Sequence, residues 1–329
     1  MREMKDSGIE WVGIIPSHWI IHPVYYYFGE RKNKNKFGQE DNLLSLSYGK
    51  IIRKDINTSE GLLPESFNTY NIAEKGDIVI RPTDLQNDKR SLRTGLVRER
   101  GIITSAYICL KPIKDIDSRF FNYQLHSYDV IKVFYNMGNG VRQGLNFSEF
   151  SHLLVFEPPL DEQRRIADYL DAKCTEIDAL TADIQTQIDT LEQYKRSVIT
   201  EAVTKGLNPD AEMKDSNIQW IGMMPSHWDC IRGKYILKYI QKPVREDDGV
   251  ITCFRDGEVT LRSNRREDGF TMADKEIGYQ GIDVGDLVVH GMDGFAGAIG
   301  ISDSRGKASP VLNVLDTEQS KRYIMYFLR

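Results

Sequence analysis

Residues 160–204 read LDEQRRIADYLDAKCTEIDALTADIQTQIDTLEQYKRSVITEAVT and contain no proline or glycine. Pro158-Pro159 precede this stretch, and Gly206 and Pro209 follow it, as residues that flank a helix and do not interrupt it. The stretch is therefore predicted to form one continuous α-helix, roughly 65 Å long at about 1.5 Å per residue. A domain of this size does not need such a helix for its own core, so we expect the helix to act as a spacer.

The apolar residues of this stretch repeat with heptad spacing, which is typical of a seam that packs on another helix. One heptad position is apolar along the whole seam, whereas Lys173, Gln187 and Glu201 interrupt the second position. The residues predicted to pack against another helix are Ile166, Leu170, Ile177, Leu180, Ile184, Leu191, Tyr194 and Val198.

An internal repeat is the strongest signal outside the helix. Residues 3–19, EMKDSGIEWVGIIPSHW, recur without a gap as EMKDSNIQWIGMMPSHW at residues 212–228, and the two copies contain all four tryptophans. A repeat at this distance is too long for a solenoid and indicates duplication of a whole module. We expect the tryptophans to anchor each module on neighbouring structure and not to bind a ligand.

The two modules are predicted to share a framework and to differ in their surfaces. Gly76-Asp77 and the apolar residues after it match Gly285-Asp286 in the second module, whereas the sequences between the matching points diverge. Apolar runs at 43–46, 78–80 and 106–110 suggest strands, and residues 120–134 suggest a helix. The predicted fold class is α+β, with two duplicated mixed domains at 1–156 and 208–329 and a long-helix spacer region at 157–207.

The second module stops at a point that matches residues 120–125 of the first, so that residues 126–204 have no counterpart after residue 329. A second long helix would belong to that missing part. We therefore expect the second module to be incomplete, as in a truncated gene product.

Composition is ordinary for a globular protein, with 40% apolar and 28% charged residues among 329. No apolar run approaches the length of a membrane span, and the N-terminus does not resemble a signal peptide, so a cytoplasmic protein is predicted. Cys109, Cys174, Cys230 and Cys253 are widely separated, which favours packing roles over a metal site or disulfides.

The net charge of −5 is distributed unevenly. Residues 20–156 contain 19 Lys and Arg against 15 Asp and Glu, residues 157–204 contain 5 against 11, and residues 229–329 contain 15 against 16. The acidity therefore lies mainly on the predicted helix, and the first module is mildly basic. This pattern leaves a nucleic-acid partner open.

No catalytic motif of a P-loop, zinc protease, α/β-hydrolase or dinucleotide-binding protein is present in the sequence. Basic and amide side chains instead gather in loops, where Lys and Arg could contact phosphates and Arg, Asn and Gln could bind base edges. For any single residue, a solvated surface loop is the alternative. The candidates for DNA contact are Arg31, Lys32, Lys34, Lys36, Arg81, Gln86, Asn87, Lys89, Arg90, Arg93, Arg142, Arg255, Arg262, Arg265 and Arg266.

Taken together, these motifs resemble the specificity (S) subunits of type I restriction-modification systems. The resemblance covers nearly the whole chain and depends on the duplicated tryptophan segment, the GVRQGL element at 140–145, and the PPLDEQRRI element at 158–166 that leads into the long helix. It implies two target recognition domains, each binding half of a split double-stranded DNA sequence, with long antiparallel helices setting their spacing.

The resemblance also implies the partners and the chemistry of the complex. Methyltransferase (M) subunits would dock on the helices, and restriction/translocase (R) subunits would join through them. The chain itself would be non-catalytic, and S-adenosylmethionine, ATP and Mg²⁺ would be needed only by the partner subunits. The exposed seam also suggests self-association through the long helix. The alternatives are a coiled-coil scaffold that does not bind DNA and a recognition fragment of a fused restriction enzyme.

Overall fold

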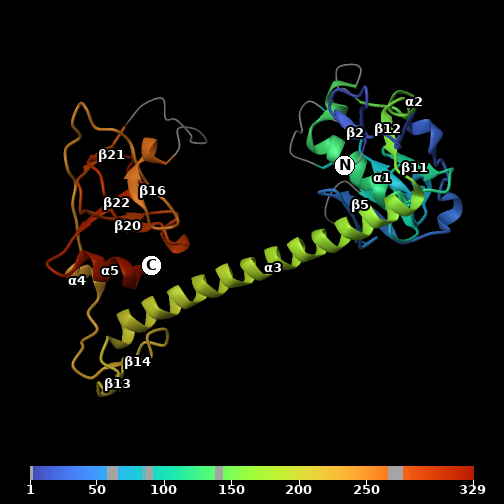
Figure 1. The fold of residues 1–329 in the computed structure, drawn as a ribbon. Helices are drawn as coiled ribbons and strands as arrows, with labels where there is room; N and C mark the ends of the chain where they lie inside the picture. Colours follow the sequence, from blue (N-terminus) through green and yellow to red (C-terminus); the bar gives the residue numbers. More distant parts are fainter. Residues whose placement is uncertain (1–2, 58–65, 84, 86–91, 138–143, 266–276) are drawn as a thin grey trace. The chain divides into compact units, whose positions relative to one another are not determined.

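The computed structural model describes residues 3–57, 66–83, 85, 92–137, 144–265 and 277–329. The chain forms two compact units, residues 1–181 and residues 182–329. The division falls inside helix α3 (Leu160–Lys205), which contributes residues to both units. Figure 1 shows α3 as one unbroken helix, which confirms the predicted continuous helix.

The described residues of the first unit form two four-stranded sheets and two strand pairs. Its regular elements include helices α1 (Ser118–Val130) and α2 (Phe147–Phe150) and short 3-10 helices η1 (Val24–Tyr26), η2 (Lys36–Gly38), η3 (Phe67–Thr69) and η4 (Val133–Asn136). One sheet has the order β6 (Lys50–Lys54), β5 (Leu43–Ser47), β10 (Gly101–Ile103), β7 (Asn71–Ala73), and the other has the order β4 (Phe28–Glu30), β11 (Ile108–Pro112), β8 (Ile78–Ile80), β9 (Thr94–Leu96).

The main core of this unit lies between the β4-β11-β8-β9 sheet and helix α1. Asp117 caps α1 by accepting a hydrogen bond from the backbone of Arg119, and the buried face of the helix includes Phe121 and Leu125. These two side chains are fully buried and join Ile78 and other strand residues in one apolar cluster. The predicted helix at 120–134 is thus confirmed over residues 120–130, and α1 begins and ends earlier than expected.

The first copy of the tryptophan repeat forms a hairpin, β1 (Met4–Asp6) with β2 (Ile14–Pro16), and leads into β3 (Ile20–Pro23), which pairs with β12 (Leu154–Glu157). Trp19 stacks on Phe156 with ring centroids 5.1 Å apart. Trp11 contacts the edge of Tyr128 at 5.9 Å. Both tryptophans therefore pack on neighbouring elements of the same unit, as expected from the sequence.

In the part of the second unit that the structure describes, the strands form a four-stranded sheet and three strand pairs. The sheet has the order β15 (Lys238–Tyr239), β22 (Leu312–Asp316), β19 (Leu287–His290), β20 (Ile299–Ile301), and the pairs are β13 (Met213–Asp215) with β14 (Met223–Pro225), β16 (Ile251–Cys253) with β17 (Val259–Leu261), and β18 (Gln280–Ile282) with β21 (Gly306–Ala308). Its short helices are α4 (Gly233–Ile236), α5 (Lys321–Leu328), η5 (Arg262–Asn264) and η6 (Gly294–Ala296).

The two units repeat the same pattern of strand pairing. In the first unit β11 lies between β4 and β8, and β8 pairs with β9; in the second unit β22 lies between β15 and β19, and β19 pairs with β20. Each sheet is followed by a helix, α1 or α5, that contacts its last strand. The duplication inferred from the short repeat thus extends to the fold.

Helix α3 ends at Lys205, and Gly206 follows it with a φ of +77°, the left-handed conformation that glycine adopts after a helix. Trp228 of the second tryptophan repeat packs closely on this glycine: a Cβ added to Gly206 would lie 3.3 Å from the Trp228 ring. The hydroxyl of Tyr323 also donates a 2.8 Å hydrogen bond to the carbonyl of Val203. The end of the helix is therefore fixed within the second unit.

The four cysteines are all free, but they differ in environment. Cys109 and Cys253 are buried in strands, and burial raises the pKa of the Cys253 thiol to about 12. Cys174 on α3 and Cys230 are exposed. The expected packing role is confirmed for the buried pair and is wrong for the exposed pair, because a cysteine in sequence gives no sign of which face it occupies.

Candidate nucleic-acid interface

The basic loop, residues 31–36, leaves strand β4 and runs beside the edge strand β7. The backbone of Lys34 forms an isolated antiparallel β-bridge with Asn71, and the backbone amide of Ile72 donates a 2.7 Å hydrogen bond to the carbonyl of Asn33. The side chains of Lys32, Lys34 and Lys36 are exposed. The sequence prediction of a surface cluster of lysines thus agrees with the positions of these three residues, whereas their contact with DNA stays a prediction.

Two of the candidate arginines are used inside the first unit. Arg31 forms a two-point ion pair with Asp77, whose side chain is 1% exposed. Arg93 is itself fully buried, and its guanidinium donates to the carbonyl of Thr83. The Arg93 contact joins the two ends of the connection between β8 and β9, whereas the Arg31 contact lies at the start of β8. The sequence analysis expected both guanidinium groups on an open surface, and neither lies on one.

Arg81 is the remaining first-unit candidate among the described residues. Arg81 follows β8 directly, and its amide donates to the carbonyl of Arg93 over 2.8 Å. Six candidates fall outside the described residues, so their geometry is not part of the site: Gln86, Asn87, Lys89, Arg90, Arg142 and Arg266.

In the second unit, the candidate arginines pair with neighbouring carboxylates. Arg255 lies 3.0 Å from Asp293, and its side chain is 70% exposed. Arg265 pairs with Asp256 and stacks on the ring of Phe254 at 4.2 Å. Arg262 donates to the hydroxyl of Thr252 over 3.4 Å. Arg262 and Arg265 therefore bond to residues of the β16–β17 hairpin, and Arg255 itself lies in the turn of that hairpin.

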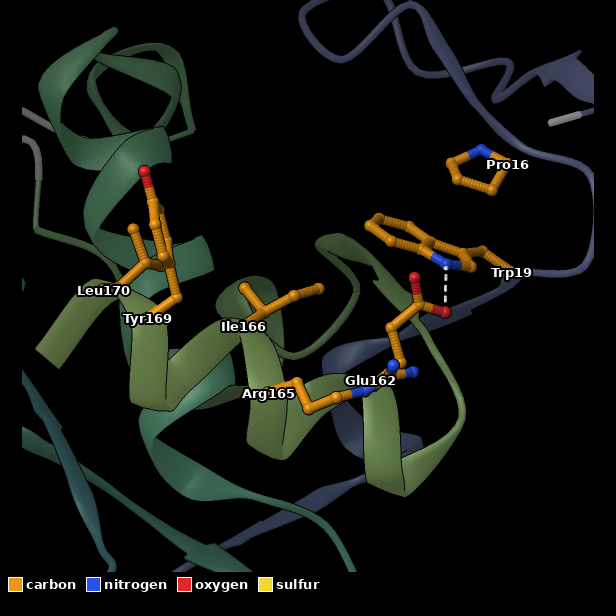
Figure 2. Close-up of a pocket in the computed structure, with 7 residues that line it drawn as sticks. All are labelled: Pro16, Trp19, Glu162, Arg165, Ile166, Tyr169 and Leu170. Carbon is orange, nitrogen blue, oxygen red and sulfur yellow. Dashed lines mark hydrogen bonds between the residues drawn. The ribbon is translucent and has the colours of Figure 1, made fainter. Parts of the chain in front are cut away.

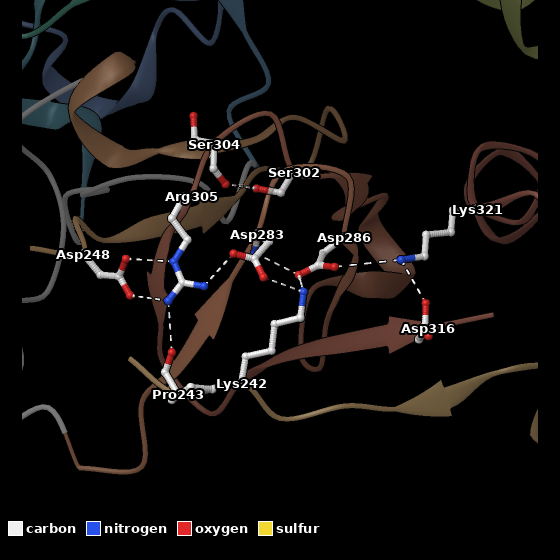
Figure 3. A network of polar contacts seen from close by, with 10 residues as sticks. All are labelled: Lys242, Pro243, Asp248, Asp283, Asp286, Ser302, Ser304, Arg305, Asp316 and Lys321. Carbon is white, nitrogen blue, oxygen red and sulfur yellow. Dashed lines mark hydrogen bonds and ion pairs between the residues drawn. The ribbon is translucent and has the colours of Figure 1, made fainter. Parts of the chain in front are cut away.

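A polar network in the second unit was not anticipated from the sequence (Figure 3). Arg305 pairs with Asp248 and Asp283, while Lys242 pairs with Asp283 and Asp286 at 2.8 and 2.6 Å. Hydrogen bonds from Lys242 and then Arg305 lower the pKa of the Asp283 carboxyl to about 2. Asp286 is the repeat counterpart of Asp77, so both units place a cation against the same buried aspartate. The shared Gly-Asp pair was the signal that could have revealed this.

The seam of α3 is exposed over most of its length. Seven apolar side chains along α3 are each between 46% and 67% exposed. Six are predicted seam residues, and Ile188 lies one turn after Ile184: Ile177, Leu180, Ile184, Ile188, Leu191, Tyr194 and Val198. Ile166, in contrast, packs against the core of the first unit. Apart from Ile166 and the partly buried Leu170, the seam residues predicted from the sequence therefore present an apolar stripe with no cover within the described chain.

A pocket lies where the first turns of α3 meet the first tryptophan repeat (Figure 2). Its lining includes Trp19, Ile166 and Tyr169. The Glu162 carboxylate accepts hydrogen bonds from the Trp19 indole at 3.2 Å and from His18 at 2.9 Å. Glu162 in the acidic first turn of α3 therefore holds the tryptophan segment, which links these two motifs in the structure.

Other site types find no support within the described residues. The described parts of the chain contain no group of three or more His, Cys, Asp or Glu side chains that could hold a metal ion. None of the helices described is long and apolar enough to cross a membrane.

Comparisons with known proteins agree with this geometry. Residues 28–190 match the family model of the type I restriction modification DNA specificity domain. A putative type I restriction enzyme MjaX specificity subunit from Methanocaldococcus jannaschii is 24% identical over 232 residues, covering 67% of this chain and 53% of the relative. The MjaVIII specificity subunit from the same organism is 26% identical over 140 residues, covering 42% of this chain and 31% of that subunit.

A solved structure shows the same fold. A chain from a study titled "Structural basis underlying complex assembly and conformational transition of the type I R-M system" superposes with a TM-score of 0.54 at 13% identity, covering 95% of this chain and 80% of that one. The present chain spans about half the length of the first relative and a third of the second.

Proposed function

Because the chain belongs to the family of type I restriction-modification specificity subunits, we propose that it recognises a bipartite DNA sequence and directs a methyltransferase and a nuclease to it. Membership of this family implies a non-catalytic role. Each unit would bind one half of the target, and α3 would set the spacing between the two halves. The half-site spacing would then follow from protein geometry, as it does in dimeric DNA-binding proteins.

The observation that supports this proposal best is a repeated fold with divergent loops. Both units keep the same strand pairing, and both pair a buried aspartate with a cation, Asp77 with Arg31 and Asp286 with Lys242. The sequences between the matching points of that framework diverge. A protein that must recognise two different short sequences needs such an arrangement, with one scaffold and two sets of contacts.

The distribution of charge supports different partners for the loops and for helix α3. The exposed lysines of the basic loop suit phosphate contacts, and their contribution would weaken as salt rises because bound counterions are released. Helix α3 carries most of the acidic excess and an exposed apolar seam. These features favour protein partners over DNA, so we assign the helix to M-subunit docking and to self-association.

The remaining parts of the proposal concern the assembled complex. R subunits would join through the M subunits, and S-adenosylmethionine, ATP and Mg²⁺ would bind only in the partners. The complex would act in the cytoplasm, where the DNA is.

The test is reconstitution with M subunits, followed by measurement of methylation across a library of DNA sequences. Methylation confined to one split sequence is expected. Sequence-independent methylation, or no methylation when all partners are present and active, would contradict the proposed role in sequence recognition. A scaffold that does not bind DNA would instead show no salt-dependent DNA affinity in the assembled complex; the family match does not favour that alternative.

A further inference from the structure

Phe37 is an exposed aromatic side chain at the end of the basic loop. It is 90% exposed, the highest value among the large apolar side chains described in the first unit. Lys36 precedes it, and Lys32 and Lys34 lie on the same exposed segment. Phenylalanine normally buries most of its ring, so its position beside three lysines calls for a physical reason.

The backbone at Phe37 is also unusual. Its φ of 69° and ψ of 16° lie in the left-handed region, which is unfavourable for a residue with a Cβ. Tyr48 also has a positive φ, but it forms a two-residue hairpin turn with Gly49 between β5 and β6, where the turn type requires that conformation. No hairpin explains Phe37. Strain of this kind persists where the surrounding structure enforces it, and it is frequent at binding sites.

The loop beneath Phe37 is held firmly. The Asn35 side chain is 1% exposed, donates to the carbonyl of Glu40 at 2.9 Å and accepts from the amide of Glu40 at 3.0 Å. The backbone amide of Asn35 donates to the carbonyl of Tyr70, and the Lys34 ammonium donates to the carbonyl of Thr69. Phe37 is therefore displayed from a fixed support, and its exposure follows from this ordered arrangement.

Cations oppose two of the carboxylates near Phe37 in sequence. Glu30 pairs with Lys32 at 2.8 Å and Glu40 pairs with Arg100 at 3.0 Å, whereas Asp41 is exposed. Lysines beside an exposed ring match the combination that proteins use to bind DNA with an inserted apolar side chain, in which basic groups contact phosphates and the ring enters a base step.

We propose that Phe37 is an apolar wedge that inserts between adjacent base pairs of the DNA bound by the first unit. The ring unstacks one base step and bends the duplex, while the neighbouring lysines contact the phosphates on either side. This inference rests on the proposed function and adds to it a mode of recognition, because the cost of unstacking depends on which base step is opened.

The experiment uses the full chain assembled with its M subunits and a pool of duplexes with a randomised centre. The wild-type complex first selects its preferred duplexes. Dissociation constants are then measured by fluorescence anisotropy, and bending is measured by energy transfer between dyes at the two DNA ends. The variants are Phe37→Ala, Phe37→Gly and the control Tyr48→Ala, which removes an exposed aromatic ring at the opposite edge of the β6-β5-β10-β7 sheet.

Phe37→Ala is expected to weaken binding about 5- to 100-fold, as the loss of one aromatic–base contact does, and to reduce the bend. Phe37→Gly should weaken binding similarly without lowering the melting temperature, since glycine accepts the left-handed backbone. Tyr48→Ala should leave affinity and bend unchanged.

The outcomes separate the two levels of inference. If the wild-type complex selects DNA but the Phe37 variants bind and bend it equally well, or lose affinity without any loss of bend, the wedge is wrong and DNA recognition stands. If the wild-type complex shows no selection and no salt-dependent binding, the proposed function fails and the wedge fails with it.

Discussion

The exposed seam of α3 predicts that the chain self-associates, and Ile184→Glu is the perturbation that tests this. Ile184 lies near the middle of the seam and is 48% exposed. A coiled-coil partner would bury the remaining part of its side chain and of the other six seam residues. A glutamate at this position would place a charge in that contact, which is costly without a partner charge.

The free energy gained by burying the seam in a dimer follows from the exposed fractions of its side chains. Full burial of a large apolar side chain stabilises by roughly 1.5–3 kcal/mol, so the exposed half of each seam residue contributes about 1 kcal/mol. Two copies with seven such residues each contribute about 14 kcal/mol before the cost of association, which is roughly 4–15 kcal/mol. A dimer that forms at micromolar concentrations is the expected result. Ile184→Glu removes about 2 kcal/mol of burial per dimer, so the dissociation constant should rise at least about 30-fold.

Sedimentation equilibrium over a range of concentrations provides the assay. The wild-type chain should move from monomer to dimer, and Ile184→Glu should stay monomeric over the same range. Ala182→Glu is the matched control, because it adds the same charge on the opposite, polar face of α3 and should leave the equilibrium unchanged. A wild-type chain that is strictly monomeric at tens of micromolar would refute the reasoning, as would equal effects of the two substitutions.

Three further predictions concern stability. Glu162→Gln weakens the charge-assisted contacts with His18 and Trp19 and should destabilise the first unit by about 1–2 kcal/mol in thermal unfolding; an unchanged melting temperature would contradict this. Asp283→Asn should lower the stability of the second unit by about 1 kcal/mol at neutral pH, since the side chain is 41% exposed and its ion pairs are screened. The pKa of Asp283 is lowered to about 2, so its contribution is present above about pH 4 and lost between about pH 4 and 2; wild type and variant should converge there on acid titration. Phe121→Ala opens a cavity at a fully buried position and should cost about 3–5 kcal/mol, measured by denaturant unfolding.

Much of the architecture could be predicted because it depends on local sequence. Residues 160–204 contain no proline or glycine and have a heptad pattern of apolar residues, which together predict a helix. Helix α3 ends one residue later than expected. The strands β5 and β8 coincide with short apolar runs, because buried strands need apolar side chains. The repeat of Gly-Asp at 76–77 and 285–286 correctly indicated a shared framework.

The roles of individual basic residues could not be predicted, because they depend on contacts between distant parts of the chain. Arg31 and Lys32 are neighbours in sequence, yet one pairs with the buried Asp77 and the other is exposed. Arg93 looked like a loop residue and is fully buried. The exposure of Phe37 could not be predicted, because a single aromatic residue forms no periodic pattern. Its positive φ is a property of the folded chain.

The distribution of the four thiols gives the protein its own pair of labelling sites. Cys174 and Cys230 are exposed and lie in different units, whereas Cys109 and Cys253 are buried and burial raises the pKa of both thiols. A thiol-reactive spin label should therefore attach at one place in each unit without any engineered cysteine. Pulsed dipolar spectroscopy on the labelled protein would then give the separation of the two units in solution, with and without DNA, and so test whether one fixed distance underlies recognition.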